Sequence, residues 1–158
     1  MSRKLLVLNA ATLSPAAVEA HAPNLRALGA AGGIRPLGAV FPGLTCASHA
    51  TMLTGSLPEA HGMVGNGWYE REHAKLFMWN RSSHLVAGEK LWEAAAKREP
   101  GLRCANLFWR NAADSSCETV ITERPVYWSS GRKSFDVYTR PNALHDPLLS
   151  SILSLIHI

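Results

Sequence analysis

The sequence lacks long apolar runs, paired cysteines and clusters of one charge. No apolar segment approaches the roughly 20 residues of a membrane-spanning helix, so we expect no transmembrane segment. The three cysteines, Cys46, Cys104 and Cys117, include no CxxC pair, and this odd set predicts reduced thiols in a cytoplasmic protein rather than a disulfide framework. The net charge is +4 but the lysines and arginines are scattered, so we expect no nucleic-acid-binding surface.

The beginning of the chain has too short an apolar run for a signal peptide. Only four apolar residues, Leu5 to Leu8, separate the basic start from Asn9, whereas a signal peptide has an apolar region of about 7–15 residues. We therefore expect a buried first strand at residues 5–8. The chain has 158 residues, of which 47% are hydrophobic, and this is enough to bury the core of one domain.

Short apolar runs alternate with helical stretches along the chain. The alternation predicts an α/β fold with a mostly parallel sheet and helices on both faces. Ser14-Pro15 is a typical helix start and Gly32-Gly33 a typical helix end, so we expect one helix between them. The other predicted elements are strands at 34–41, 75–79, 103–108 and 118–122, helices at 46–54 and 89–98, and an irregular insert or hairpin at 125–140.

The segment from Phe41 to Tyr69 contains the residues that most clearly indicate a chemical function. It predicts a strand, a tight turn and then a helix that starts near Thr45. The start of a helix presents unpaired N–H groups and the positive end of the helix dipole, so it binds phosphate well. A hydroxyl at this place can cap the helix or attack phosphorus as a nucleophile. Thr45 alone is compatible with both roles.

Further residues at fixed spacing after Thr45 favour the nucleophile. The pattern is T-x-x-x-H-x-T-x-x-T-G, followed by P-x-x-H-G and an asparagine. Its members are Thr45, His49, Thr51, Thr54, Gly55, Pro58, His61, Gly62 and Asn66. This segment resembles the nucleophile region of nucleotide pyrophosphatase/phosphodiesterase-like proteins of the alkaline phosphatase superfamily, in a bacterial branch. The resemblance covers most of the chain and implies an incomplete alkaline-phosphatase-like core.

The resemblance implies metal-dependent hydrolysis of small phosphate esters, either phosphodiesters and pyrophosphates or monoesters. Thr45 would attack phosphorus to form a phospho-threonine intermediate, with two divalent metal ions, usually zinc, lowering the pKa of its hydroxyl and positioning water. Asn66 would donate its side-chain amide to a phosphoryl oxygen beside the backbone N–H of Cys46, although Gly65-Asn66-Gly67 is also typical turn sequence. The two histidines of the pattern are expected to fix the loop through hydrogen bonds.

The metal site that the resemblance implies is weakened in this chain. Active relatives carry an aspartate ligand at the end of the first strand, followed by glycine and leucine. Aligning Leu13 with that leucine puts Ala11 in the aspartate's place and Thr12 in the glycine's. Alternatively, Asn9 takes the aspartate's place, and the metal ligands of this chain are then Asn9 and Thr45. An amide oxygen lacks the negative charge that holds zinc tightly, so a non-catalytic phosphate-binding or interaction module is the alternative function.

The end of the sequence predicts a truncated product. A doubly wound sheet normally continues further, and the Asp-His pair that the family uses as metal ligands has no counterpart here. We expect residues 1–146 to be the N-terminal part of a phosphodiesterase domain that is inactive alone, and residues 147–158 to be a non-native or truncated tail. The alternative is a terminal helix at 148–155 that closes a small domain. The oligomeric state is not predicted.

Overall fold

The computed structural model describes residues 4–152, and the chain divides into two compact units. The first unit is Met1–Gly38 and the second is Ala39–Ile158. The residues that the sequence assigns to one site are distributed over both units, because Asn9 belongs to the first unit and Thr45 and Asn66 belong to the second. Each unit is described by itself.

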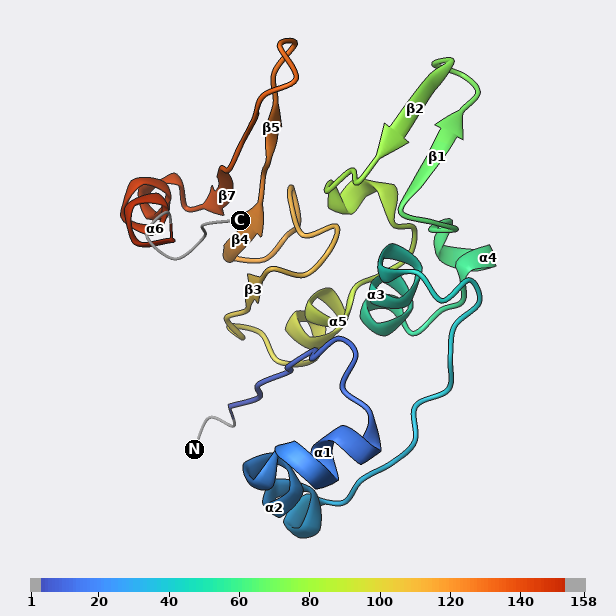
Figure 1. The fold of residues 1–158 in the computed structure, drawn as a ribbon, viewed down its shortest axis with the longest axis vertical. Coiled ribbons are helices and arrows are strands. Elements are labelled where there is room, and N and C mark those ends of the chain that lie inside the picture. The colour runs from blue at the N-terminus through green and yellow to red at the C-terminus, as the bar shows by residue number, and fades with distance from the viewer. Residues whose placement is uncertain (1–3, 153–158) are drawn as a thin grey trace. The chain divides into compact units, whose positions relative to one another are not determined.

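Two helices form the regular structure of the first unit, α1 (Pro15–His21) and α2 (Pro23–Gly32) (Figure 1). Ser14 caps α1 by accepting a backbone N–H at 3.2 Å, and Gly33, with φ +94°, ends α2. The predicted helix start and helix end are therefore confirmed. The single helix expected between them was wrong, because Pro23 lacks an N–H donor and disfavours helical backbone at the residue before it.

The strands predicted at residues 5–8 and 34–41 are not formed. Both segments lack regular hydrogen-bonded structure, and their apolar side chains are exposed, with Leu5 at 85% and Phe41 at 92%. A strand depends on a hydrogen-bonded neighbour, and neither segment pairs with a strand among residues 4–152. Apolar composition alone was therefore not sufficient to predict a strand here.

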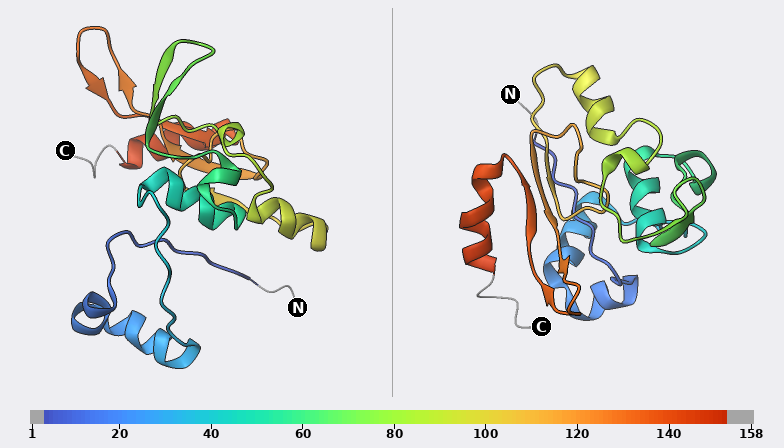
Figure 2. Two further views of the ribbon diagram at one scale, coloured as in Figure 1. Left: turned by 90° about the vertical axis from the view of Figure 1, so that its right-hand side faces the viewer. Right: turned by 90° about the horizontal axis from the view of Figure 1, so that it is seen from above.

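The second unit begins with the motif segment, which folds as two helices and a hairpin. The predicted helix at 46–54 is confirmed as α3 (Thr45–Thr54), and the predicted strand at 75–79 as β2. The elements from the motif to the middle of the chain are α3, α4 (Pro58–His61), β1 (Gly67–Glu70), β2 (Lys75–Met78), the 3-10 helix η1 (Ser83–Leu85) and α5 (Leu91–Arg98). The antiparallel β1–β2 hairpin projects from this unit as an arm (Figures 1 and 2).

The second half of this unit contains a three-stranded sheet in the order β3-β4-β7. Strands β3 and β4 are parallel, whereas β4 and β7 are antiparallel. The sheet is therefore mixed, and the mostly parallel sheet with helices on both faces is not confirmed within residues 4–152. The elements are β3 (Ala105–Leu107), β4 (Thr119–Glu123), β5 (Val126–Tyr127), β6 (Lys133–Ser134), β7 (Val137–Arg140), the 3-10 helix η2 (Asn142–Leu144) and α6 (His145–Ile152). The predicted hairpin at 125–140 is confirmed as the antiparallel pair β5–β6 followed by β7.

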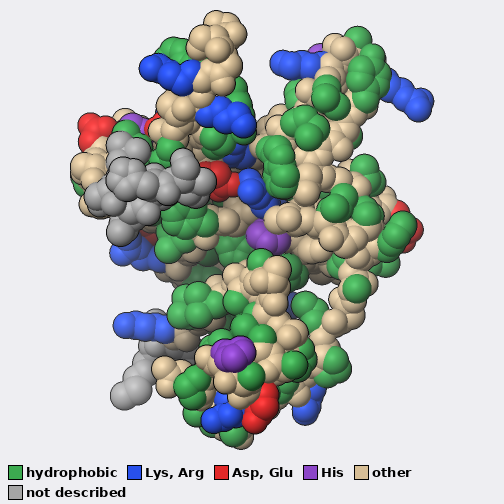
Figure 3. All heavy atoms as spheres, in the orientation of Figure 1, with side chains coloured by type: hydrophobic (Ala, Val, Ile, Leu, Met, Phe, Trp, Pro, Cys, Tyr) green, Lys and Arg blue, Asp and Glu red, His purple; other side chains and the backbone are tan. Residues whose placement is uncertain are grey.

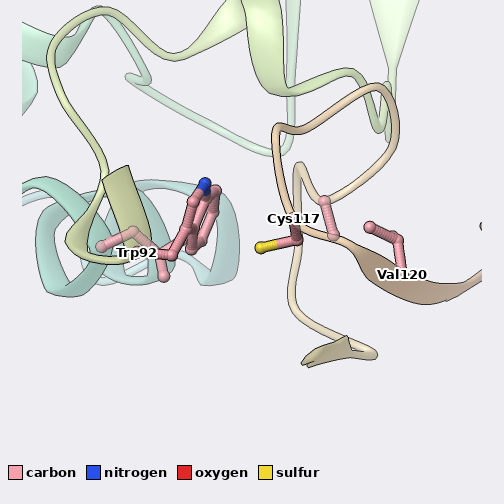
Figure 4. Close-up of a cluster of buried hydrophobic side chains, with 5 residues drawn as sticks. Trp92, Cys117 and Val120 are labelled. Atoms are coloured by element: carbon pink, nitrogen blue, oxygen red, sulfur yellow. The ribbon is translucent and has the colours of Figure 1, made fainter. Parts of the chain in front are cut away.

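Two small hydrophobic clusters hold the second unit together, and α3 contributes to both. Leu53 belongs to a cluster with Trp92, Cys117 and Val120, and in Figure 4 the Cys117 sulfur points toward the Trp92 ring. The other cluster is Cys46, Ala50, Met63 and Val86. Cys46, Ala50 and Leu53 have the i, i+4, i+7 spacing of one helix face, so α3 is buried along one side, in one cluster near its start and in the other near its end. Hydrophobic side chains also remain on the surface of both units (Figure 3).

The described part of the chain contains no helix with the length and apolar character to cross a membrane. Helix α6 runs through residue 147, the predicted start of a non-native tail. Residues 153–158, which form the rest of that predicted tail, lie outside the described residues. The predicted domain boundary therefore stays a prediction.

Candidate active site

Thr45 is the first residue of α3, and its side chain is exposed. The cap residue of the helix is Leu44, which has extended backbone and no side chain that could accept a hydrogen bond. Within the described residues, the Thr45 hydroxyl makes no hydrogen bond that would use it as a cap. The capping alternative for Thr45 therefore has no support from the geometry, and the hydroxyl is accessible at the positive end of the helix dipole.

Asn66 supplies the missing cap from a different part of the chain. Its Oδ1 accepts the backbone N–H of Cys46, the second residue of α3, at 3.0 Å. The backbone of Asn66 is fixed as well, because its carbonyl accepts the N–H of Trp79 at 2.8 Å. Gly67 permits this close approach, since a Cβ there would lie 2.8 Å from the carbonyl oxygen of Phe77. The sequence prediction that Asn66 and the start of this helix lie together is thus reproduced in the structure.

The orientation of the Asn66 amide follows from that contact. With Oδ1 directed at Cys46, the Nδ2 group is the remaining donor of this side chain, and it has no hydrogen-bond partner among the described residues. An amide NH₂ carries two donors. The geometry therefore leaves a donor available beside the exposed Thr45 hydroxyl.

His61 fixes the loop that leads from α3 to Asn66. Its side chain is 0% exposed, and its Nδ1 accepts the N–H of Met63 at 3.1 Å. The neutral ring then carries its proton on Nε2, which donates to Thr51 Oγ1 at 2.9 Å. Burial lowers the pKa of His61 and keeps the ring neutral. The predicted structural role of this histidine is confirmed.

The local backbone also explains why other motif residues occur at their positions. Gly55 and Gly62 both have left-handed backbone, with φ of +67° and +79°, where they end α3 and α4. Thr54 Oγ1 donates to the Ala50 carbonyl at 2.8 Å and accepts the N–H of Ser56 at 3.2 Å. Much of the motif therefore shapes the turn that brings Asn66 back to the start of α3.

Arg110 is held against this site from three sides. Its backbone N–H donates to Nδ1 of His49, which lies one helical turn after Thr45, at 3.2 Å. Its guanidinium lies 4.8 Å from the ring centre of Trp79 and forms a mostly buried ion pair with Glu123. Because Trp79 is bonded to Asn66 and His49 belongs to α3, the position of Arg110 is coupled to the site.

The charge of Arg110 affects the pKa of two neighbouring groups, His49 and Cys46. Burial lowers the pKa of His49 and Arg110 lowers it further, while Glu123 partly opposes both. Burial raises the pKa of the Cys46 thiol, and Arg110 acts in the opposite direction. Cys46 is 1% exposed, as expected for a core-facing residue rather than a reactive thiol.

The sequence analysis missed Arg110 and Glu123. Both follow from the parallel pairing of β3 and β4, because Arg110 comes shortly after the end of β3 and Glu123 is the last residue of β4. Functional side chains of α/β folds gather at the carboxyl ends of parallel strands. Because Arg110 and Glu123 follow the predicted strands at 103–108 and 118–122, their positions in the sequence could have indicated a functional role.

Asn9, the other predicted metal ligand, is exposed and lies in irregular backbone of the first unit. The turn after it contains Thr12 with φ +64°. A β-branched residue rarely adopts this backbone, whereas glycine does so readily. The conformation therefore favours the alignment in which Thr12 takes a glycine's place and Ala11 the place of the aspartate.

Comparison with known proteins agrees with the motif. The family described as type I phosphodiesterase / nucleotide pyrophosphatase matches residues 5–154. The chain belongs to this family. It is also similar to venom phosphodiesterase from Naja atra and to venom phosphodiesterase 2 from Crotalus adamanteus, each 32% identical over 75 residues. Those matches cover 45% of this chain but 9% of each relative, so the chain spans a small part of the length of these venom enzymes.

The described residues do not fit the metal centre that the family leads us to expect. The ligands predicted in this chain, Thr45 and Asn9, offer a hydroxyl and an amide rather than the carboxylates and imidazoles that hold zinc. Among the described residues, one three-membered group could hold a metal ion, formed by Glu70, Glu72 and His73. It lies at the end of the β1–β2 hairpin, whereas Asn66 adjoins the base of that hairpin.

Proposed function

We propose that the protein to which this chain belongs hydrolyses small phosphate esters, with Thr45 as the nucleophile. The Thr45 oxygen forms a bond to phosphorus and its proton passes to solvent, while the P–O bond to the leaving alcohol or phosphate breaks and that group leaves with the bonding electrons. Water then cleaves the phospho-threonine and restores the hydroxyl. Membership of the phosphodiesterase family supports phosphate-ester hydrolysis as the reaction class.

The hydrogen bond from Cys46 N–H to Asn66 Oδ1 is the observation that carries this proposal. It joins two positions 20 residues apart and leaves the amide donor of Asn66 beside an exposed, uncapped Thr45. A donor fixed there stabilises charge that develops on a phosphoryl oxygen in the transition state. Asn66 is thus proposed to bind that oxygen.

Arg110 is proposed to add positive charge on the same side. It is anchored to His49 and Trp79 and paired with Glu123, so it needs little reordering when an anionic group approaches. A guanidinium suits phosphate because its donors match two oxygens at once.

Two divalent metal ions, expected to be zinc, belong to the proposal for the whole protein. The Thr45 hydroxyl and the Asn9 amide are the predicted ligands in this chain, and they do not suffice for such a centre. The remaining ligands would come from sequence outside the 158 residues. The roles proposed for Thr45, Asn66 and Arg110 are argued from their own groups and not from contacts with the metal ions.

The test compares three versions of the longer reading frame: wild type, Thr45→Ala and the matched Thr45→Ser. Hydrolysis of bis-p-nitrophenyl phosphate is measured with added zinc. Loss of the nucleophile should reduce kcat by at least about a thousandfold, and Thr45→Ser, which keeps a hydroxyl, should retain measurable turnover and a covalent phosphate. Equal rates for wild type and Thr45→Ala would exclude Thr45 as the nucleophile.

A second candidate is a non-catalytic relative that binds phosphate or a partner. The turn at Thr12 supports it, because the favoured alignment leaves alanine, which cannot bind a metal, in the place of an acidic ligand. Metal analysis of the purified longer protein distinguishes the two. A stoichiometry of two zinc ions per chain would contradict the non-catalytic candidate, and metal-free protein that still binds inorganic phosphate would support it.

A further inference from the structure

Two cysteines outside the candidate active site lie against each other in the second unit. The thiol of Cys117 points at the Cys104 sulfur at 3.7 Å. Both belong to or pack against the cluster around Trp92, and Figure 4 shows the Cys117 sulfur directed into that cluster. We propose that Cys104 and Cys117 are a site of oxidative modification at which a disulfide oxidant, such as glutathione disulfide, joins them in an intramolecular disulfide.

The register of the neighbouring strands holds the two cysteines together. Cys104 comes just before β3 and Cys117 just before β4, and these strands pair in parallel with Ala105 opposite Thr119. The N–H of Thr119 donates to the carbonyl of Cys104 at 3.3 Å. The pairing therefore brings the two side chains together in the folded chain without requiring any other unit of the molecule.

Contacts on both sides of the cysteines restrict movement away from this position. Arg103, next to Cys104, forms an ion pair of 2.8 Å with Glu118, next to Cys117. On the other side, Trp92 Nε1 donates to Ser116 Oγ at 3.0 Å, which fixes the residue before Cys117 to α5. A small side-chain adjustment, rather than a backbone rearrangement, brings the sulfurs to bonding distance.

The surroundings also decide which sulfur reacts first. A cavity of about 290 Å³ is lined by both cysteines together with Trp92, Glu93 and Glu118, and Cys104 is the less buried sulfur. Burial and the neighbouring Cys104 raise the pKa of Cys117 to about 12, so Cys117 is a poor first nucleophile.

The reaction balances as an ordinary thiol–disulfide exchange. The Cys104 thiolate attacks one sulfur of glutathione disulfide and releases one glutathione. Cys117 then loses its proton, attacks the Cys104 sulfur and releases the second glutathione. The protein loses two protons and two electrons, and the glutathione disulfide is reduced to two thiols.

The test is a thiol count and a peptide map of the 158-residue chain. Folded, dilute protein is incubated with glutathione disulfide in excess over glutathione, alkylated without reduction, and digested with trypsin. Cleavage after Arg103, Arg110 and Arg132 places Cys104 in the peptide 104–110 and Cys117 in the peptide 111–132, because Pro125 protects the bond after Arg124 from trypsin. We expect these two peptides to be disulfide-linked, with Cys46 alkylated after unfolding.

Variants separate this pair from nonspecific oxidation. Cys46→Ser, the control, should keep the 104–117 link, whereas Cys104→Ser and Cys117→Ser should lose it. The wild-type melting temperature should be higher in the oxidised form by roughly 5–10 °C, as expected for closing a loop of this size. Three free thiols in the wild type after oxidation, or a link that involves Cys46, would overturn the proposal. The peptide map of the wild type decides this even if a variant does not fold.

Discussion

The segment from Thr45 to Asn66 and the turn from Asn9 to Leu13 are both assigned to one site by the family resemblance, but they differ in what holds them. The first segment is fixed by hydrogen bonds made within the second unit, including Asn66 to Cys46 and His61 to Thr51. The second follows an exposed segment that pairs with no strand among the described residues. Local chemistry can therefore shape a nucleophile loop, whereas a strand-tip ligand depends on a complete sheet.

After the loss of Thr45 itself, the largest effect should come from Asn66. In the longer protein, Asn66→Ala removes the proposed donor to the phosphoryl oxygen and should lower kcat by about 100- to 1,000-fold. It also removes the acceptor for Cys46 N–H, which should cost about 1 kcal/mol of unfolding free energy. Asn9→Ala should change the stability of this loop very little. Hydrolysis of bis-p-nitrophenyl phosphate and urea unfolding measure the two effects.

Asn66→Asp is the matched control, because its carboxylate still accepts the N–H of Cys46 but cannot donate to phosphate. Stability should be kept while activity is lost. Full activity in this variant would contradict the proposed role of the Asn66 amide.

His61 gives the next largest effect, and it concerns stability. His61→Ala removes a fully buried ring and its bonds to Thr51 and Met63, so we expect a loss of about 2–4 kcal/mol. His21→Ala, at the exposed end of α1, should stay within about 0.5 kcal/mol of wild type. Urea unfolding followed by far-UV circular dichroism, which senses the helices of both units, compares them. Equal losses of unfolding free energy for both variants would show that the contacts of the second unit do not stabilise it more than those of the first unit stabilise the first.

The pH dependence of stability should be a smaller effect and should come from His61 and His49. Burial lowers the pKa of both His61 and His49, so their contribution is complete above about pH 6.5 and is lost as the pH falls through the lowered values. Asp146 and Asp136 raise the pKa of His145, and its contribution is instead present at low pH and lost as the pH rises.

A His145→Asn variant removes this opposing group. Its unfolding free energy should fall as the pH drops from about 7 to 5, and adding His61→Gln should flatten the curve. A curve that is equally steep without His61 would exclude this histidine as the source.

The sequence predicted the regions that are held by local contacts better than the regions that depend on a distant neighbour. Helices α3 and α5 were predictable because their signals are local, such as the glycine stop at Gly55. The proximity of Asn66 to the start of α3 was predictable from the motif. Arg110 was not, because its partner His49 lies 61 residues away and only the pairing of β3 with β4 brings it near. The strands at 5–8 and 34–41 were wrong because their apolar pattern says nothing about the neighbour they need.

The smallest effect should come from restoring an acidic residue at the turn after Asn9, and it distinguishes the two alignments of that turn. The positive φ of Thr12 favours Ala11 as the ligand position, so Ala11→Asp in the longer protein should strengthen zinc binding a few-fold, by about 1 kcal/mol or less. Asn9→Asp adds the same charge two residues earlier and should have a weaker effect, which makes it the matched control. Competition with a chromogenic zinc chelator measures both. If Asn9→Asp binds zinc more tightly than Ala11→Asp, Asn9 occupies the ligand position. The positive φ of Thr12 then has a cause other than the replacement of a glycine. If neither variant changes the affinity, the turn takes no part in holding the metal, and the nucleophile loop around Thr45 is then this chain's whole contribution to the site.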